Sequence, residues 1–207
     1  MTHLILIRHG EATHNQEGRW EGRGSTPLTE RGQRQAEAVA QRLAKWSPSI
    51  SHLYTSPIYR ARQTAMPIAR CLGLEAIEHD GLREIDFGHV SGLTAEDFQE
   101  AMPELYDRWQ DRGDLSFQFP GGEQRLAFFQ RIGQALDEIL ARHPGQHVAI
   151  VAHGGTMRAG LAYLFPDSMS DWWAYSLRTG SISHVRVASD GNVLLSLNDC
   201  QHLDGQL

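Results

Sequence analysis

The stretch Leu4-Ile5-Leu6-Ile7-Arg8-His9-Gly10-Glu11 joins a short apolar run to a polar, glycine-containing turn near the start of the chain. The apolar run from Leu4 to Ile7 predicts a first β-strand. It is too short for a membrane span, and too short for the core of a signal peptide, which also needs a basic segment before it. We therefore expect a cytoplasmic protein whose first strand carries Arg8 and His9 at its carboxyl end.

The rest of the chain alternates short apolar runs with longer amphipathic ones, which is the pattern of βαβ units. Further strands are expected over residues 52–55, 76–78 and 148–152, with a closing hairpin over 182–187 and 193–197. Helices are expected over about 28–46, 58–71, 123–143 and 155–165, and short helices with irregular chain over 88–122. The expected fold class is α/β, a three-layer sandwich with a mainly parallel central sheet flanked by helices, in a single domain over residues 1–207.

The composition of the 207 residues excludes several classes of function. The net charge is −6 and no basic block appears, so we expect no nucleic-acid partner and no membrane partner bound through bulk charge. Of the 19 lysine and arginine residues Lys45 is the one lysine, and its neighbours Ala44 and Trp46 rule out a Gly-Lys-Ser/Thr phosphate loop. Cys71 and Cys200 form no C-x-x-C pair, which is typical of a reduced cytosolic chain.

Polar side chains gather where predicted strands end. They lie in four segments, namely Arg8 to Glu11, Ser56 to Arg62, Arg83-Glu84 and His153 to Gly155. Because the carboxyl ends of parallel strands border one ligand crevice, we expect these four segments to converge. Arginines, histidines and glycine-rich turns that lead into helices supply forked donors and free backbone N–H groups, which suit a phosphate group.

A metal or a nucleotide cofactor fits the sequence less well. His143 and His147 are four residues apart, but Pro144 and Gly145 between them prevent a shared helix face, and no other cluster of metal-binding residues is visible. The segment Gly22-Arg23-Gly24 lacks both a third glycine and a preceding strand, which argues against a dinucleotide site. We therefore expect no metal and no cofactor.

In order along the chain, the polar blocks resemble those of the histidine phosphatase superfamily, in its phosphoglycerate-mutase-like branch. The first block is Leu6 to Glu11, with Asn15 four residues further on. The later blocks are Thr26 to Gly32, Ser56 to Ala65, Leu82 to Gly88, Phe119 to Glu123 and His153-Gly154. A lone Arg-His-Gly would be weak support, whereas six ordered blocks with a histidine at both catalytic places are strong support.

The resemblance implies a role for each matching residue. His9 matches the nucleophile that takes up the phosphoryl group, and neighbouring arginines are expected to favour its neutral form. Glu84 matches the general acid that protonates the leaving oxygen and then activates water. Arg8, Arg60 and His153 match the family's phosphate pocket, and with His9 and Glu84 they make up the expected catalytic residues. The expected substrate-binding residues are Arg8, Asn15, Glu21, Gly22, Arg60, Gly154 and Gly155. Asn15 would add an amide donor, and Gly154 or Gly155 would add a backbone N–H group.

Other residues near these blocks have more ordinary expected roles. Glu21 stands where many relatives have glutamine, which places a carboxylate at the phosphate rim. Arg62 is expected in a helix-surface ion pair and Glu11 as a residue that orients others. Trp172-Trp173 is expected in the core or at a subunit contact, which leaves a homodimer open. Arg19, Arg23 and Arg31 are expected on a solvated face. The aromatic residues of 98–119 are expected mainly in the core, with a substrate lid as the second alternative.

The implied function is hydrolysis of a small phosphorylated metabolite, a phosphomonoester, through a phosphohistidine on His9. One alternative is a cofactor-dependent phosphoglycerate mutase, although mutases of this branch resemble longer chains in the region where this chain has residues 89–120. Another is a non-catalytic phospho-ligand-binding module, which usually loses the nucleophile or its partner. Relatives handle phosphoserine, α-ribazole phosphate, sugar phosphates and phosphoglycerates, and Asn198 to Leu203 resembles tails that close over the pocket in some of them.

Overall fold

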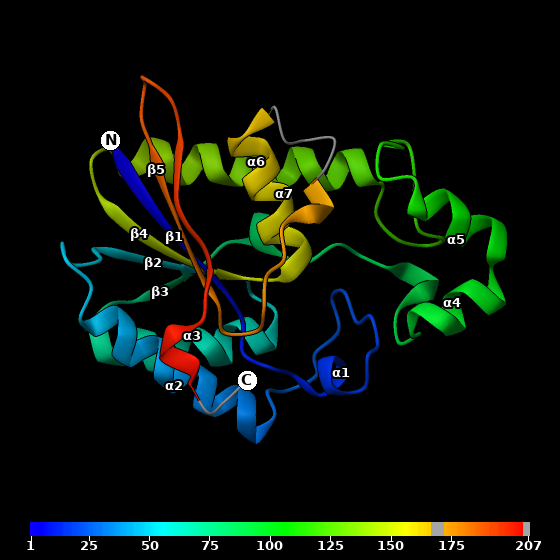
Figure 1. Ribbon diagram of the computed structural model, residues 1–207, viewed down its shortest axis with the longest axis horizontal. Helices are drawn as coiled ribbons and strands as arrows, with labels where there is room; N and C mark the ends of the chain where they lie inside the picture. Colours follow the sequence, from blue (N-terminus) through cyan, green and yellow to red (C-terminus); the bar gives the residue numbers. More distant parts are fainter. Residues whose placement is uncertain (167–171, 205–207) are drawn as a thin grey trace.

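A mixed sheet runs through the middle of the molecule in the order β3-β2-β4-β1-β5-β6 (Figure 1). The computed structural model describes residues 1–166 and 172–204. The strands are β1 Thr2–Arg8, β2 His52–Thr55, β3 Ala76–Glu78, β4 His147–Ala152, β5 Ile182–Val187 and β6 Val193–Asp199. The first four strands pair in parallel, whereas β5 and β6 form an antiparallel hairpin on β1. The mainly parallel sheet and the closing hairpin expected from the sequence are confirmed.

Helices cover both faces of this sheet. The α-helices are α1 Thr13–Gln16, α2 Glu30–Ala44, α3 Tyr59–Leu72, α4 Ala95–Ala101, α5 Pro103–Gln110, α6 Arg125–Arg142 and α7 Gly154–Leu164. Short 3-10 turns add η1 Asp80–Leu82, η2 Gly88–Val90 and η4 Gln201–Leu203. Helices α2 and α3 lie on one face, α6 and α7 lie on the other, and α4 and α5 project at one end (Figure 1). The three-layer α/β sandwich is therefore confirmed.

The alternation of side chains along the central strands explains the two helical layers. In β1, Leu4 and Leu6 pack toward the core beneath α6 and α7, whereas Ile5 and Ile7 pack toward the core beneath α2 and α3. Successive side chains of a strand point to opposite faces, so a strand that is apolar throughout needs cover on both sides. The unbroken run Leu4-Ile5-Leu6-Ile7 requires that cover.

Local signals set the bounds of the helices. The side chain of Thr29 accepts a hydrogen bond from Gly32 N–H, so α2 begins at Glu30 rather than at Leu28. Gly73 ends α3 in the left-handed conformation, with φ 66°, which costs glycine little. None of the described helices is both long enough and apolar enough to cross a membrane.

Candidate active site

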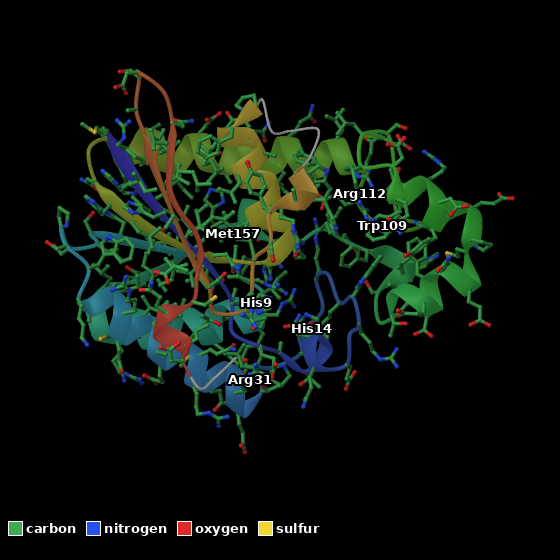
Figure 2. The ribbon with its side chains drawn as sticks, viewed as in Figure 1. His9, His14, Arg31, Trp109, Arg112 and Met157 are labelled. Atoms are coloured by element: carbon green, nitrogen blue, oxygen red, sulfur yellow. The ribbon has the colours of Figure 1, made fainter. Side chains whose placement is uncertain are left out.

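The predicted polar segments meet around a cavity of about 270 Å³ at the carboxyl ends of β1, β2 and β4. We call it the central cavity. Figure 2 shows His9 and His14 together beyond the end of β1, and Trp109 and Arg112 on the α5 side. The polar lining includes Arg8, His9, His14, Asn15, Arg19, Glu21, Arg60, Glu84, Arg125 and Arg158, and the aromatic lining is Trp20, Phe87, Trp109, Phe119, Phe128, Trp172 and Trp173.

His9 is buried and held in one orientation. Its Nδ1–H donates to the carbonyl of Gly10 over 2.7 Å, which leaves a lone pair on Nε2. That Nε2 accepts a hydrogen bond from Nε of Arg60 over 3.1 Å. Burial lowers the pKa of His9 well below its usual value, and the charges of Arg60 and Arg8 lower it further. The direction agrees with the neutral form expected from the sequence, although burial and not the arginines is the largest cause.

Arg60 is 1% exposed, and all three nitrogens of its guanidinium donate hydrogen bonds. Its NH1 donates to Oε2 of Glu21 over 2.9 Å and to the carbonyl of Gly24, and its NH2 donates to the carbonyl of Gly22 over 2.6 Å. Glu21 and Gly22 line the central cavity as expected, and their side-chain and carbonyl oxygens hold Arg60. Both therefore position the guanidinium that covers His9.

Two buried nitrogens of the site have no hydrogen-bond partner among the described residues: Nε of Arg8 and Nδ1 of His153. Ser56 Oγ lies 2.8 Å from Nε2 of His153, so a Ser56 hydroxyl that donates there leaves the His153 proton on Nδ1. Arg8 lines the central cavity, whereas His153 lies behind His9 with the two rings 5.1 Å apart and is not itself part of the lining. An unmet buried donor costs about 1–3 kcal/mol, which an anion that reached it would remove. Burial and then the Arg60 charge lower the pKa of His153 well below its usual value, and burial lowers that of Arg8 to about 10.

Glu84 is fixed by the amino end of α7. Its Oε2 accepts from Gly155 N–H over 2.9 Å, and its Oε1 accepts from the N–H groups of Ile85 and Thr156. A carboxylate is favoured at this end of a helix by the free N–H groups and the helix dipole. The expectation that Gly155 N–H could bind phosphate is therefore wrong, because this N–H already donates to Glu84.

A close contact between glycines shapes the turn after β1. A Cβ atom on Gly32 would lie 1.9 Å from the carbonyl oxygen of Glu11, and one on Gly10 would lie 2.4 Å from the oxygen of Gly32. Only residues without a side chain permit this approach. The start of α2 therefore packs directly against the turn that carries His9.

The more ordinary expectations are also largely met. Arg62 forms a surface ion pair with Glu78 at 3.0 Å. Glu11 accepts a hydrogen bond from the Thr29 hydroxyl and pairs with Arg31, so it braces the start of α2.

Asn15 uses its Oδ1 to accept from Ala12 N–H, and its amide nitrogen lies 2.9 Å from Nε2 of His14. Arg23 pairs with Asp86 and Glu123. Of the four segments expected to converge, the Arg83 side chain stays outside the cavity and pairs with Asp80.

The aromatic residues largely lie in the core, as expected, whereas the tail does not lie where the resemblance placed it. Trp172 packs in the core against Phe129, and both Trp172 and Trp173 line the central cavity, where the Trp173 ring lies beneath Arg158. The core alternative is therefore confirmed for Trp172, and the homodimer stays a prediction. The tail resemblance is also corrected, because η4 packs against α2 and the residues of 198–203 do not line the central cavity.

Several residues of the cavity lining were missed, among them His14, Arg158 and Trp173. The ring of His14 lies 6.1 Å from that of His9, and Arg158 and Trp173 line the same cavity. A signal existed for Arg158, since it lies four residues after Gly154 and so on the same helix face. Within the described parts of the chain, no group of three or more His, Cys, Asp or Glu side chains could hold a metal ion.

Comparisons with known proteins show which family and which structures this chain resembles. The sequence profile of the histidine phosphatase superfamily (branch 1) matches residues 4–200. Phosphoserine phosphatase 1 of Hydrogenobacter thermophilus is 36% identical over 203 residues, which covers 98% of this chain and 95% of that protein. The metal-independent phosphoserine phosphatase of Arabidopsis thaliana is 34% identical, over 98% of this chain and 84% of that protein. A crystal structure of a phosphoserine phosphatase variant from Entamoeba histolytica, in complex with phosphoserine, superimposes with a TM-score of 0.86 at 28% identity and covers 98% of this chain and 100% of that one.

Proposed function

This chain belongs to the histidine phosphatase superfamily, and from that premise we propose that it hydrolyses small phosphomonoesters through a phosphohistidine on His9. One observation carries the assignment of His9. Its Nε2 accepts a hydrogen bond from Arg60, and near it lie two buried donors, Arg8 Nε and His153 Nδ1, that have no protein partner among the described residues. A phosphoryl group bound there would supply acceptors to both donors and phosphorus to the nucleophile.

The first half-reaction forms the N–P bond and breaks the ester bond. Nε2 of His9 attacks phosphorus, and the ester oxygen leaves with the bonding electrons and takes a proton from Glu84. Arg8, Arg60 and His153 stabilise the charge on the three non-bridging oxygens of the transferring group, and Gly154 N–H is placed to add a backbone donor. Because Nδ1–H is held by the Gly10 carbonyl, the ring stays aligned while charge develops on it.

The second half-reaction returns the enzyme to its starting state. Water gives a proton to the Glu84 carboxylate as its oxygen attacks phosphorus, and the N–P bond breaks with its electrons returning to Nε2 of His9. Inorganic phosphate then leaves. The sequence of steps needs no metal ion, and Glu84 ends with the proton that the next substrate requires.

The names of the relatives favour a phosphorylated amino acid as substrate. The two curated proteins and the solved structure named above are phosphoserine phosphatases, and we extend phosphoserine to this chain as the first substrate to be tested. We further propose that residues 1–207 act as one catalytic domain without a cofactor, in the cytoplasm, on a small phosphorylated metabolite rather than on nucleic acid. A homodimer remains a prediction for sedimentation analysis to test.

A phosphate-release screen tests this function. The panel comprises p-nitrophenyl phosphate, phosphoserine, a sugar phosphate and 3-phosphoglycerate, each assayed with and without excess chelator. We expect release from the panel to persist in chelator, and release from 3-phosphoglycerate to outrun its isomerisation. Activity that disappears in chelator and returns with a divalent ion would contradict the proposal, and isomerisation well above phosphate release would favour a mutase.

A further inference from the structure

Arg158 reaches the central cavity from the same face of α7 as the two glycines that border the catalytic groups. A Cβ atom on Gly154 would lie 3.4 Å from the guanidinium carbon of Arg8, and one on Gly155 would lie 2.4 Å from Glu84. Arg158 follows these glycines by four and three residues, and helical side chains lean toward the amino end of their helix. Its guanidinium is therefore directed back toward Glu84 and the leaving-group side of the site.

Two other arginines that line the central cavity, Arg125 and Arg19, already donate hydrogen bonds to acceptors of the protein. Arg125 donates to the carbonyls of Trp109, Asp111 and Asp114, so it ties down the chain after α5. Arg19 lies at the rim, where it donates to the carbonyl of Gly92 and pairs with Asp97. Neither of them has a guanidinium without a protein acceptor.

Arg158 is held differently. Its Nε donates to the carbonyl of Tyr175 over 2.9 Å, and its guanidinium carbon lies 4.5 Å from the centre of the Trp173 ring. Its two terminal nitrogens have no acceptor among the described residues. Burial lowers the pKa of Arg158 while the charge of Glu84 raises it, so Arg158 and Glu84 are electrostatic neighbours. The side chain is thus oriented by a hydrogen bond to Tyr175 and by the Trp173 ring, and it lines the central cavity.

We propose that Arg158 binds a carboxylate on the leaving group, so that the preferred substrate is a phosphomonoester with a carboxylate a few bonds from the ester oxygen. The proposal rests on the proposed function and names the substrate class of that same site. A planar guanidinium offers two parallel N–H groups that match the two oxygens of a carboxylate. Because Arg158 borders Glu84, this carboxylate would lie close to the oxygen that Glu84 protonates.

Phosphoserine and phosphoethanolamine test this assignment, since they share the phosphate and the amine and differ by the carboxylate. We expect the wild type to prefer phosphoserine in kcat/KM. The substitution Arg158→Met keeps the apolar stem over Trp173, and it should lower kcat/KM for phosphoserine by about 10- to 100-fold while leaving phosphoethanolamine within about twofold. Arg158→Lys should restore part of the preference. Arg62→Met, which removes a surface ion pair outside the central cavity, should preserve it.

The inhibition constant of inorganic phosphate gives an independent readout, because phosphate carries no leaving group. It should change by less than about twofold in Arg158→Met, provided that thermal unfolding shows a folded variant. Equal losses for the two substrates, a weakened phosphate inhibition, or a wild type without preference for the carboxylate would overturn the role of Arg158. Failure of the proposed function looks different, since the wild type would then release phosphate from neither substrate nor from p-nitrophenyl phosphate.

Discussion

Arg60 donates its Nε–H to Nε2 of His9 over 3.1 Å, so that a guanidinium covers the lone pair expected to attack phosphorus. Glu21 and the carbonyls of Gly22 and Gly24 fix the rest of that guanidinium. We infer that an arriving phosphate takes over the Nε–H of Arg60 and thereby uncovers the nucleophile. The contact with a cation also excludes a protonated His9.

The charge state of His9 is the first prediction. Burial and the two arginines lower its pKa well below 6.5, so the folded protein should keep the ring neutral as pH falls through that value. Nitrogen-15 NMR of the ring in a ¹⁵N-histidine sample should show a neutral His9 at pH 5.5. The same resonance in urea-unfolded protein should report a protonated ring at that pH. A folded-state titration of His9 near pH 6.5 would contradict the geometry.

Covalent labelling is the second prediction. A labelled phosphomonoester should leave phosphate on His9, stable to base and labile to acid, and His9→Ala should abolish both label and turnover. His14→Ala is the matched control, since its ring lies 6.1 Å from that of His9 in the same cavity. We expect this control to retain the label. Label on a serine or an aspartate would refute the assignment.

The third prediction concerns proton donation by Glu84. Alkyl phosphates leave as strongly basic alkoxides and need the proton, whereas p-nitrophenolate leaves without it. Glu84→Gln should therefore slow single-turnover phosphorylation by phosphoserine about 100- to 10,000-fold, and far less by p-nitrophenyl phosphate. Single turnovers are needed because the second half-reaction also uses Glu84 as a base.

Two checks keep the test of Glu84 specific. The amide of Glu84→Gln has one accepting oxygen where Glu84 has two, so it cannot serve all three N–H groups of Gly155, Ile85 and Thr156, which costs about 1–3 kcal/mol of stability; folding is therefore verified by thermal unfolding. Asp86→Asn is the control, because the Asp86 carboxylate accepts from Gly88 N–H and pairs with Arg23 rather than lining the cavity. Equal slowing for both leaving groups would mean that Glu84 positions the substrate.

The fourth prediction concerns Glu21, whose carboxylate neutralises part of the charge of Arg60. Glu21→Gln keeps an acceptor for Arg60 and removes a negative charge, so the inhibition constant of inorganic phosphate should fall by about three- to tenfold. Glu123→Gln is a matched control, since Glu123 also has 13% of its side chain exposed and also pairs with arginines, but outside the cavity. Weaker phosphate inhibition in Glu21→Gln would show instead that Glu21 acts by positioning Arg60.

The sequence predicted the parts of this fold that depend on local pattern. Strands β2 and β3 lie at the predicted residues, and the alternation in β1 required helices on both faces. Helix α2 was predicted to run to Trp46 but ends at Ala44, because apolar spacing does not mark a helix end.

The contacts within the site were harder to predict from the sequence. That Gly155 N–H would serve Glu84 depends on the packing of segments 71 residues apart. The position of Arg158 beside the cavity could have been predicted, since its spacing from Gly154 is visible in the sequence. Its contact with Trp173 could not, because that contact is set by tertiary structure.

The fifth prediction concerns stability at low pH and rests on a histidine cluster far along β1 from the cavity. Nδ1 of His3 lies 2.9 Å from Nε2 of His184, and the rings of His3 and His147 stack at 4.3 Å. Burial is the largest cause that lowers the pKa of His184, to about 4, and it lowers those of His3 and His147 as well. All three rings are thus harder to protonate in the folded state than in the unfolded chain.

The direction of the effect follows from proton binding. Between pH 6.5 and about 4, His184 binds a proton in the unfolded chain but not in the folded protein. The free energy of unfolding should therefore be highest above pH 6.5 and fall as the pH drops below it. After allowance for solvent screening, we expect His184 to account for about 1 kcal/mol of the decline between pH 7 and pH 5. Urea unfolding of His184→Gln at both pH values should show a decline smaller by that amount, whereas His89→Gln, at an exposed histidine of η2, should keep the wild-type decline. An unchanged decline in His184→Gln would mean that the cluster tolerates a proton in the folded state.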